Sequence, residues 1–380
     1  MPAQATDQQP VWPDAGRALL VRRELAAKPP LVRADDVRAL RSLLADVAAG
    51  EAHVLQAGDC AEDPADRGPA AVAGKVVLLD LLAGELERTT GTPVVRVGRI
   101  AGQYAKPRSR ATESVGGVEL PVYRGHLVNG PEPDPASRRP DPRRLLSCYD
   151  AASTVLGLLR GTGVWSSHEA LLLDYEEPLL RRDGPERVLT STHWPWIGNR
   201  TNRAGGRHAG MLAGVANPVA AKVGPGVAVA DLLALCARLD PHREPGRLTF
   251  VARMGADAVA ARLPPLVTAV RAAGHPVIWL TDPLHGNTVA TPDGRKTRVL
   301  TTVVREVVAF QEAVAAGGGV AGGLHLETTP DPVTECAADE SGIDSRGDGY
   351  TSLCDPRLNP EQAIEVVSAW RALPGTAKSP

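Results

Sequence analysis

The sequence has few aromatic residues and cysteines, no excess of either charge and no long apolar run. Phe, Trp and Tyr make up 3% of its 380 residues, and 42 Lys and Arg stand against 44 Asp and Glu, for a formal net charge of -2. This balance gives no electrostatic reason to expect nucleic acid or anionic lipid as a partner. No stretch offers the roughly 20 consecutive apolar residues of a membrane span, and residues 1–20 lack the features of a signal peptide. We therefore expect a cytoplasmic protein.

The five cysteines are an odd number at irregular spacing, which argues against a disulfide framework. Some of them are then left for metal binding or catalysis. Hydrophobic residues at 43% and charged residues at 23% are ordinary values for a globular chain, and they exclude disordered and fibrous architectures. The length fits two or three domains, or one α/β barrel of about 250 residues with additions.

Short β-prone runs alternate with helical patterns from residue 53 onward. The expected strands are 53–60, 93–101, 191–198, 219–224, 247–254, 275–282, 322–328 and 350–355. Helical patterns occupy 71–89, 141–161, 229–240, 257–274 and 297–317. This alternation is more typical of a closed (β/α)8 TIM barrel than of an open sheet. We predict an α/β fold with a barrel over 53–380, an excursion at about 110–145, and an N-terminal extension, 1–52, that packs on the barrel.

Potential metal ligands occur at the predicted carboxyl ends of four different strands, where the active sites of such barrels lie. They are Cys60, His285, Glu327 and Asp355. One thiolate, one imidazole and two carboxylates suit a divalent first-row transition ion better than Mg²⁺. Each residue taken alone is more often a packing residue, so the prediction of a metal site depends on all four together.

A second set of strand-end residues is cationic. It comprises Arg99, Arg200, Lys222 and Arg253, with Lys106 in a following turn. Arg binds phosphate and carboxylate groups through two parallel hydrogen bonds, whereas Lys acts as a point charge. Convergent cations predict more than one anionic group, so we expect small phosphorylated and carboxylated substrates. For any single Arg, a surface salt bridge is the competing explanation.

Eight motifs follow one another along the chain. They are LQAGDCAE (55–62), RIAGQYAKPRS (99–109), WIGNRT (196–201), ANPVAAKVGP (216–225), ARMGAD (252–257), DPLHGNT (282–288), GGLHLETTPDPVTEC (322–336) and CDPRLN (354–359). Together they resemble the class II 3-deoxy-D-arabino-heptulosonate 7-phosphate (DAHP) synthases, and the resemblance covers nearly the whole chain from residue 12. It implies a (β/α)8 barrel that condenses phosphoenolpyruvate with erythrose 4-phosphate, the entry step of the shikimate pathway, with one divalent metal ion.

The resemblance implies roles for individual residues. Cys60, His285, Glu327 and Asp355 would bind the metal, with Mn²⁺ or Co²⁺ favoured and Fe²⁺ or Zn²⁺ as alternatives. Phosphoenolpyruvate would be bound by Arg99, Arg200, Lys222 and Arg253, and the erythrose phosphate by Lys106, Pro107, Arg108 and Ser109. Trp196 would form a wall of the site, and Asp282 and Asn287 would orient His285. Lys222, Arg99 and His285 are the expected catalytic residues.

Three positions near the expected aldehyde pocket depart from the family pattern. Asn199 and His126, both expected to contact substrate, replace a Glu and an Asp, and Gly205 lies near a position where the family has Asp. One alternative function is therefore the same chemistry on an amino or imino analogue of erythrose phosphate, as in an aminoDAHP-type synthase. Another is a non-catalytic paralogue that binds a partner enzyme such as chorismate mutase. We also expect a homo-oligomer.

The chain is shorter than family members that are regulated by aromatic amino acids. Those members carry a helical hairpin before a segment like SHEALLLDYE (167–176), and the residues that precede this segment here leave no room for one. We therefore expect no strong feedback inhibition by Trp or Phe through that element. Such an enzyme suits a secondary-metabolite pathway, where flux continues when aromatic amino acids are plentiful.

Overall fold

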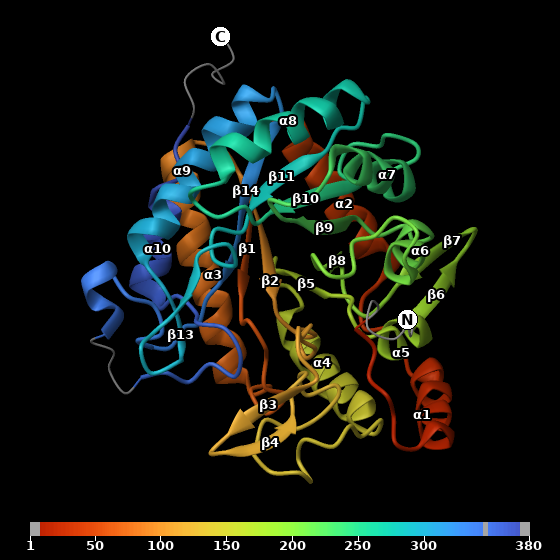
Figure 1. Ribbon diagram of the computed structural model, residues 1–380. Coiled ribbons are helices and arrows are strands. Elements are labelled where there is room, and N and C mark those ends of the chain that lie inside the picture. Colours follow the sequence, from red (N-terminus) through yellow and green to blue (C-terminus); the bar gives the residue numbers. More distant parts are fainter. Residues whose placement is uncertain (1–7, 345–348, 373–380) are drawn as a thin grey trace.

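The computed structural model describes residues 8–344 and 349–372, and a closed barrel of eight parallel strands lies at its centre (Figure 1). In barrel order the strands are β1 (His53–Gly58), β2 (Val94–Arg99), β5 (Trp165–Glu169), β8 (Trp194–Ile197), β9 (Val219–Val223), β10 (Leu248–Ala252), β11 (Ile278–Thr281) and β14 (Val320–Glu327). Strand β14 closes the ring by pairing in parallel with β1. The predicted α/β barrel is confirmed.

Helices that follow the barrel strands cover the outside of the barrel. They are α3 (Pro69–Thr90), α4 (Arg144–Leu159), α6 (Arg207–Ala213), α7 (Val229–Leu239), α8 (Val259–Ala272), α9 (Leu300–Ala316) and α10 (Pro360–Ser368). Figure 1 shows α3, α9 and α10 along one side of the barrel and α6 and α7 along the other. Within the described ranges, no helix has the length and apolar character that a membrane span requires.

Smaller elements decorate the loops. Three antiparallel hairpins pair β3 (Thr112–Val115) with β4 (Val118–Pro121), β6 (Leu180–Asp183) with β7 (Glu186–Leu189), and β12 (Thr288–Ala290) with β13 (Lys296–Arg298). Helix α5 (Leu173–Glu176) and the 3-10 helices η2 (Glu177–Leu179) and η3 (Glu340–Asp344) are further short elements of the loops. The β3–β4 hairpin lies in the predicted excursion. Only residues 160–164 join α4 to β5, so no helical hairpin is inserted there.

Two N-terminal helices precede the barrel. Helix α1 (Ala15–Ala27) contacts α4 and α5, and α2 (Ala34–Ala48) contacts β14. The buried face of α2 carries Leu40, Leu44 and Val47, which pack in one apolar cluster with Trp194 and Ile278. Because Trp194 and Ile278 begin their strands, α2 lies at the amino end of the barrel, opposite the end where the strands finish.

One barrel strand was missed in the sequence. Strand β5 contains Ser166, Ser167 and His168, which are buried and therefore hid the strand from a search for apolar runs. Their side chains are satisfied by local partners: the Ser167 hydroxyl donates to the backbone oxygen of Trp194 (2.6 Å), and His168 Nε2 lies 2.8 Å from Glu176 Oε1. Buried polar groups with partners cost little, so a polar strand is stable inside this barrel.

The prediction of a strand at 350–355 is wrong. The described part of this segment is a loop, and the eighth barrel position belongs to β5 instead. Glu335 takes the backbone N–H groups that a strand would have used: Oε1 accepts from Thr351 (3.1 Å) and Ser352 (2.7 Å), and Oε2 accepts from Arg357 (2.6 Å). A buried carboxylate therefore fixes this loop, which carries Asp355, without a β-ladder.

Candidate active site and metal centre

The carboxyl ends of the barrel strands surround a cavity of about 410 Å³. The predicted site residues that line it are Arg99, Lys106, Pro107, Arg108, Trp196, Asn199, Arg200, Lys222, Arg253, His285 and Asp355. Glu169, Gly198, Thr288 and Lys296 line it as well. Seven of these side chains are cationic and two are carboxylates, so the cavity suits a ligand that carries several negative charges.

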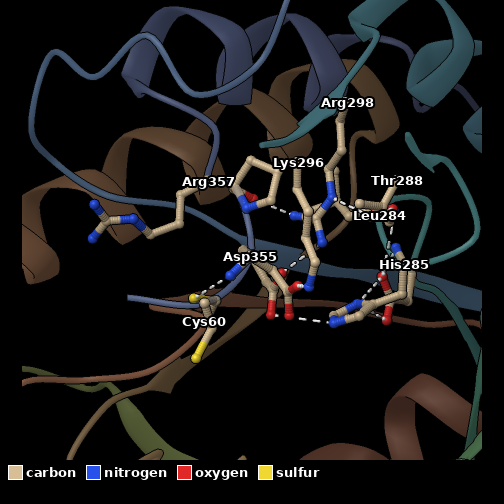
Figure 2. A network of polar contacts seen from close by, with 12 residues as sticks. Cys60, Leu284, His285, Thr288, Lys296, Arg298, Asp355 and Arg357 are labelled. Atoms are coloured by element: carbon tan, nitrogen blue, oxygen red, sulfur yellow. Dashed lines mark hydrogen bonds and ion pairs between the residues drawn. The ribbon is translucent and has the colours of Figure 1, made fainter. Parts of the chain in front are cut away.

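Three of the four predicted metal ligands form a cluster at one side of the cavity. His285, Glu327 and Asp355 each offer a ligand atom, and these atoms all lie within 4.8 Å of one another. Cys60, the fourth, is adjacent: its Sγ accepts from the backbone N–H of Asp355 at 3.4 Å. Figure 2 shows Cys60, Asp355 and His285 gathered together, with Lys296 and Arg298 reaching toward them and Arg357 directed away.

The charges around this cluster fit a bound cation. The ammonium group of Lys106 lies 3.7 Å from Glu327 Oε1 and 3.4 Å from Asp355 Oδ2, so a positive charge is already favourable beside both carboxylates. Burial alone would raise the pKa of Glu327, but His285, Lys106 and the nearby Arg side chains outweigh it and hold that pKa well below its usual range. The carboxylates are therefore ionised, as metal ligands must be.

Asp282 fixes the orientation of the His285 ring. His285 Nδ1 lies 2.7 Å from Asp282 Oδ2, while Nε2 faces Glu327 Oε1 at 3.4 Å. Burial lowers the pKa of His285 despite the two nearby carboxylates, so the ring is neutral at pH 7. With the Nδ1 proton donated to Asp282, the lone pair of Nε2 points toward the cluster, which is the arrangement found around histidine ligands of metals.

Lys222 connects the metal cluster to the cationic side of the cavity. It lies in β9, is 4% exposed, and donates to Asp282 Oδ2 at 2.6 Å. Its ammonium group also lies 4.7 Å from the centre of the Trp196 ring, a cation–π contact. Burial lowers the pKa of Lys222, and the positive charge of Arg99 lowers it further, although Asp282 opposes both effects.

A chain of buried hydrogen bonds holds Arg99 at the end of β2. Gln56 and Arg99 contact opposite nitrogens of the His325 ring, with 2.6 Å between Arg99 Nη1 and His325 Nε2. Arg99 Nη2 then donates to Glu327 Oε1 at 3.0 Å. Burial, with Lys222 and Arg99, holds the pKa of His325 well below its usual range, so the neutral ring can accept from Arg99. The barrel interior thus orients this guanidinium rigidly.

Two further cations lie around the rim. Arg200 Nη2 donates to the hydroxyl of Ser109 at 2.6 Å, which places Ser109 beside the cavity although it is not a lining residue. Arg253 Nη2 donates to the backbone oxygen of His285 at 2.8 Å. Loops that follow β2, β8, β10 and β11 therefore converge at this rim. This agrees with the prediction that cationic residues at the strand ends come together in one site.

The three departures from the family pattern lie in different places. Asn199 lines the main cavity, and Gly205 lines a neighbouring cavity of about 740 Å³ that shares Asn199 and Arg253 with it. His126 lines a separate cavity of about 320 Å³ together with Asp63. The backbone turns before His126 at Gly125, whose φ is 95°, and the His126 side chain is thereby outside the cavity where it was expected.

Sequence analysis missed three charged residues of this site. Glu169 ends the unpredicted strand β5 and is buried at the cavity, where its Oε1 has no hydrogen-bond partner. Burial raises the pKa of Glu169, although Lys222, Lys106 and Arg99 oppose the shift. Lys296 and Arg298 belong to the β12–β13 hairpin, and Arg298 Nη2 donates to Glu327 Oε2 at 2.8 Å. The basic run RKTR (295–298) was the available signal for these two.

The fold and the site define a (β/α)8-barrel enzyme whose strand ends gather an anion-binding cavity and a candidate metal centre. The model of the class II DAHP synthetase family matches residues 2–164 and 159–369. The chain belongs to this family.

Individual relatives agree with this assignment. A probable phospho-2-dehydro-3-deoxyheptonate aldolase of Pseudomonas fluorescens is 53% identical over 379 residues, which cover 97% of this chain and 95% of the relative. A phospho-2-dehydro-3-deoxyheptonate aldolase of Streptomyces coelicolor is 40% identical over 418 residues, covering 94% of this chain and 93% of the relative. That alignment is longer than the chain itself, so the Streptomyces protein contains residues with no counterpart here.

A solved structure supports the fold. The phospho-2-dehydro-3-deoxyheptonate aldolase of Francisella tularensis superposes with a TM-score of 0.57 at 15% identity, covering 92% of this chain and 97% of that chain. At this identity the likeness concerns the fold alone. The overall fold is therefore shared beyond recognisable sequence similarity.

Proposed function

We propose that this protein is a metal-dependent DAHP synthase, which condenses phosphoenolpyruvate with erythrose 4-phosphate and releases phosphate. The observation that carries the proposal is one cavity in which seven cationic side chains adjoin a His, Glu and Asp cluster. Phosphoenolpyruvate bears a carboxylate and a phosphate, and the second substrate bears another phosphate. Convergent Arg and Lys side chains in one cavity suit these three anionic groups.

The cations divide the cavity into two parts. Arg99 and Lys222 are anchored by buried carboxylates and Arg253 by the backbone oxygen of His285, which suits a fixed grip on phosphoenolpyruvate. Arg200 and Ser109 lie at the exposed rim, near Arg108 in the β2 loop, and suit the phosphate of the aldehyde, which moves Arg200 from its expected place at phosphoenolpyruvate. Lys106 lines the same cavity from a buried position beside Asp355. With the two substrates bound side by side in these two parts of the cavity, C3 of the enol phosphate lies toward the aldehyde carbon. This arrangement lowers the entropic cost of the bond-forming step.

His285, Glu327, Asp355 and Cys60 would hold the metal ion, with Mn²⁺ or Co²⁺ favoured by the mixed donor set. A bound divalent ion supplies Lewis acidity to the aldehyde oxygen. Lys222 donates a hydrogen bond from a position between the two halves of the site, and its lowered pKa makes its proton easier to give to the developing alkoxide. Asp282 holds that ammonium in place.

After the carbon–carbon bond has formed, water adds to C2. A proton of that water must leave as the new carbon–oxygen bond forms. Glu169 is suited to accept it, because its Oε1 has no partner and burial raises its pKa. The C2–O bond to the phosphate then breaks, the C2 hydroxyl loses its proton, and phosphate and a 2-keto sugar acid result.

The test is a reaction of metal-stripped protein with phosphoenolpyruvate and erythrose 4-phosphate, with and without Mn²⁺ or Co²⁺. Loss of the enol phosphate and release of phosphate are followed together. We expect turnover only with metal. The matched control is His285→Ala, which should remain folded and inactive. Turnover without metal would contradict the proposal. Absence of turnover in protein that binds both metal and phosphoenolpyruvate would contradict it as well.

A second candidate keeps the same chemistry but uses an amino or imino analogue of the aldehyde. It is favoured by Asn199, a neutral amide in the main cavity where the family has a carboxylate. Comparing kcat/KM for the two aldehydes on one preparation decides between them. The non-catalytic alternative is weaker, because a protein without activity has no physical reason to keep so many buried cations and carboxylates around one cavity, where each costs desolvation energy.

A further inference from the structure

Glu306 lies on α9, outside the barrel, and does not line the cavity, yet both of its oxygens bind loops at the cavity. The side chain is 1% exposed. Its Oε1 accepts from the backbone N–H groups of Met254 at 3.1 Å and Gly255 at 2.9 Å. Its Oε2 accepts from Nδ2 of Asn287 at 2.6 Å. One carboxylate therefore holds the loop after β10 to the loop after β11.

These two loops carry Arg253 and His285. Met254 follows Arg253 directly, and Asn287 comes two residues after His285. The loops also touch at two glycines: a Cβ atom on Gly286 would lie 2.4 Å from the backbone nitrogen of Gly255. Such a close approach admits no other residue, so the carboxylate secures a crossing where the two backbones are already in contact.

Asn287 completes the connection between the loops. Its Oδ1 accepts from the backbone N–H of Ala256 at 3.0 Å, and its Nδ2 donates to the backbone oxygen of Pro283 at 2.8 Å as well as to Glu306. Arg253 in turn donates to the backbone oxygen of His285 at 2.8 Å. The substrate-facing guanidinium and the candidate metal ligand are thus fixed relative to each other by one hydrogen-bonded unit.

We propose that Glu306 is a positioning residue that, through Asn287, fixes the spacing between Arg253 and His285 and so couples binding of the anionic substrate to binding of the metal. This inference rests on the proposed function. Glu306 acts without touching either ligand. A loss of the Glu306–Asn287 contact lets the two loops move independently, so that Arg253 and His285 no longer meet their ligands in one fixed geometry.

The experiment is a double-mutant cycle at that contact. In Glu306→Gln the side-chain oxygen still serves Met254 and Gly255, but an amide NH₂ now faces the NH₂ of Asn287 and the bond is lost. Asn287→Ala removes the same bond from the other side. Affinities for Mn²⁺ alone, phosphoenolpyruvate alone, and each in the presence of the other are measured by titration calorimetry, with no turnover required.

We expect each variant to weaken both affinities about tenfold, as loss of outer hydrogen bonds around metal ligands does, and to reduce the mutual enhancement of the two ligands. Both changes remove the Glu306–Asn287 bond, and Asn287→Ala also removes the bonds to Ala256 and Pro283. Since the Glu306–Asn287 bond is lost only once, the double variant should be no worse than the weaker-binding single variant. Asn287→Ala alone tests the contact if Glu306→Gln does not fold. The matched control is Glu176→Gln, another buried carboxylate, paired with His168 and Ser191, which should lose thermal stability and leave both affinities within twofold.

Unchanged affinities in the folded variants, or effects that add in the double variant, would overturn the positioning role while leaving the proposed function intact. Wild-type protein that binds neither Mn²⁺ nor phosphoenolpyruvate would overturn both. Loss of thermal stability without a change in either affinity would show that Glu306 serves the fold only, and this too contradicts the inference.

Discussion

The two ends of the barrel are built from opposite chemistry. At the amino end, Leu40, Leu44 and Val47 of α2 are fully buried and pack against Trp194 and Ile278. At the carboxyl end the barrel buries charged groups instead, such as the ion pairs of Arg99 and Arg298 with Glu327 and of Lys222 with Asp282. Apolar packing at the amino end provides stability that depends little on pH or salt. The charges at the carboxyl end provide a site for anions and metal, and their burial costs desolvation free energy.

Because the two ends differ in this way, substitutions at the amino end should mainly lower stability, and substitutions at the carboxyl end should mainly lower activity. An apolar side chain removed from the amino end leaves a cavity but no uncompensated charge. A charged side chain removed from the carboxyl end leaves its partner buried and alters the field that the substrates meet. Substitutions at the two ends should therefore change different measured quantities.

The largest effect is expected for Lys222→Met, which keeps the length of the side chain and removes its charge. We expect kcat to fall by about 10³-fold, the size seen when a buried donor to a developing charge is removed. Steady-state kinetics measures this, with Lys28→Met as control, since Lys28 pairs with Asp150 at the surface. A loss below tenfold would mean that the buried ammonium does not act on the reacting groups.

Leu44→Ala tests the other end. Leu44 is fully buried between α2 and the barrel, and its truncation should cost about 3 kcal/mol of unfolding free energy through lost burial and a cavity. Urea denaturation measures the loss. The folded variant should keep kcat and the KM for phosphoenolpyruvate. If activity per folded molecule falls as well, packing at the amino end is coupled to the active site, and the division of roles between the two ends is wrong.

Glu306 gives the two ends different responses to pH. Burial raises the pKa of this carboxyl from 4.5 to about 7, with Asp282 as the charged group that adds to the shift. The native state therefore binds a proton that the unfolded state has released, so stability is fully present below pH 4.5 and falls as pH rises through about 7. The change should be on the order of 2 kcal/mol.

Glu306→Gln should remove this pH dependence, whereas Leu44→Ala should leave it in place and lower stability equally at every pH. Unfolding of the three proteins between pH 4.5 and 8.5 makes the comparison. If the unfolding free energy of the wild type instead rises between pH 5 and 8, and Glu306→Gln abolishes the rise, the hydrogen bonds from Met254, Gly255 and Asn287 outweigh the effect of burial on the pKa of Glu306.

Cys60→Ser concerns the metal cluster. The hydroxyl is a poor replacement for a thiolate toward Mn²⁺, Co²⁺ or Zn²⁺, so metal affinity and activity should fall together by about tenfold or more. Calorimetric titration with Mn²⁺ and Co²⁺ gives the affinity. Stability should change little, because the neutral hydroxyl takes the same buried position. Full activity with stoichiometric metal would exclude Cys60 as a ligand.

The sequence predicted the barrel and the composition of the site because both depend on local signals. Apolar runs of strand length and residues at their ends are visible without any long-range information. Strand β5 was invisible because its Ser and His side chains are satisfied by partners from the neighbouring segments 176–194. Glu169 was missed with it, since a strand that is not recognised has no carboxyl end to search.

Contacts between loops that are far apart in the sequence were the second limit on prediction of the site. Lys296 and Arg298 approach the carboxylates from the β12–β13 hairpin, and nothing local indicates that this hairpin folds back over the cluster. The same limit applies to Glu306, which lies 51 residues from Gly255 and 19 from Asn287 in the two loops that it joins. Contacts of this kind depend on how α9 packs against the barrel, which a pattern of apolar residues does not specify.

The smallest effect is expected at His126, and it tests how far the site extends. His126 lines a cavity of about 320 Å³ with Asp63, Asp141 and Arg144, separate from the main cavity. His126→Asn should therefore change the KM for either aldehyde by less than about twofold, within the range of substitutions away from special features. Asn199→Ala, in the main cavity, should change the ratio of kcat/KM for the two aldehydes. If His126→Asn shifts that ratio as strongly, the aldehyde reaches both cavities, and the carboxyl end recognises its substrate over a wider surface than the strand ends alone.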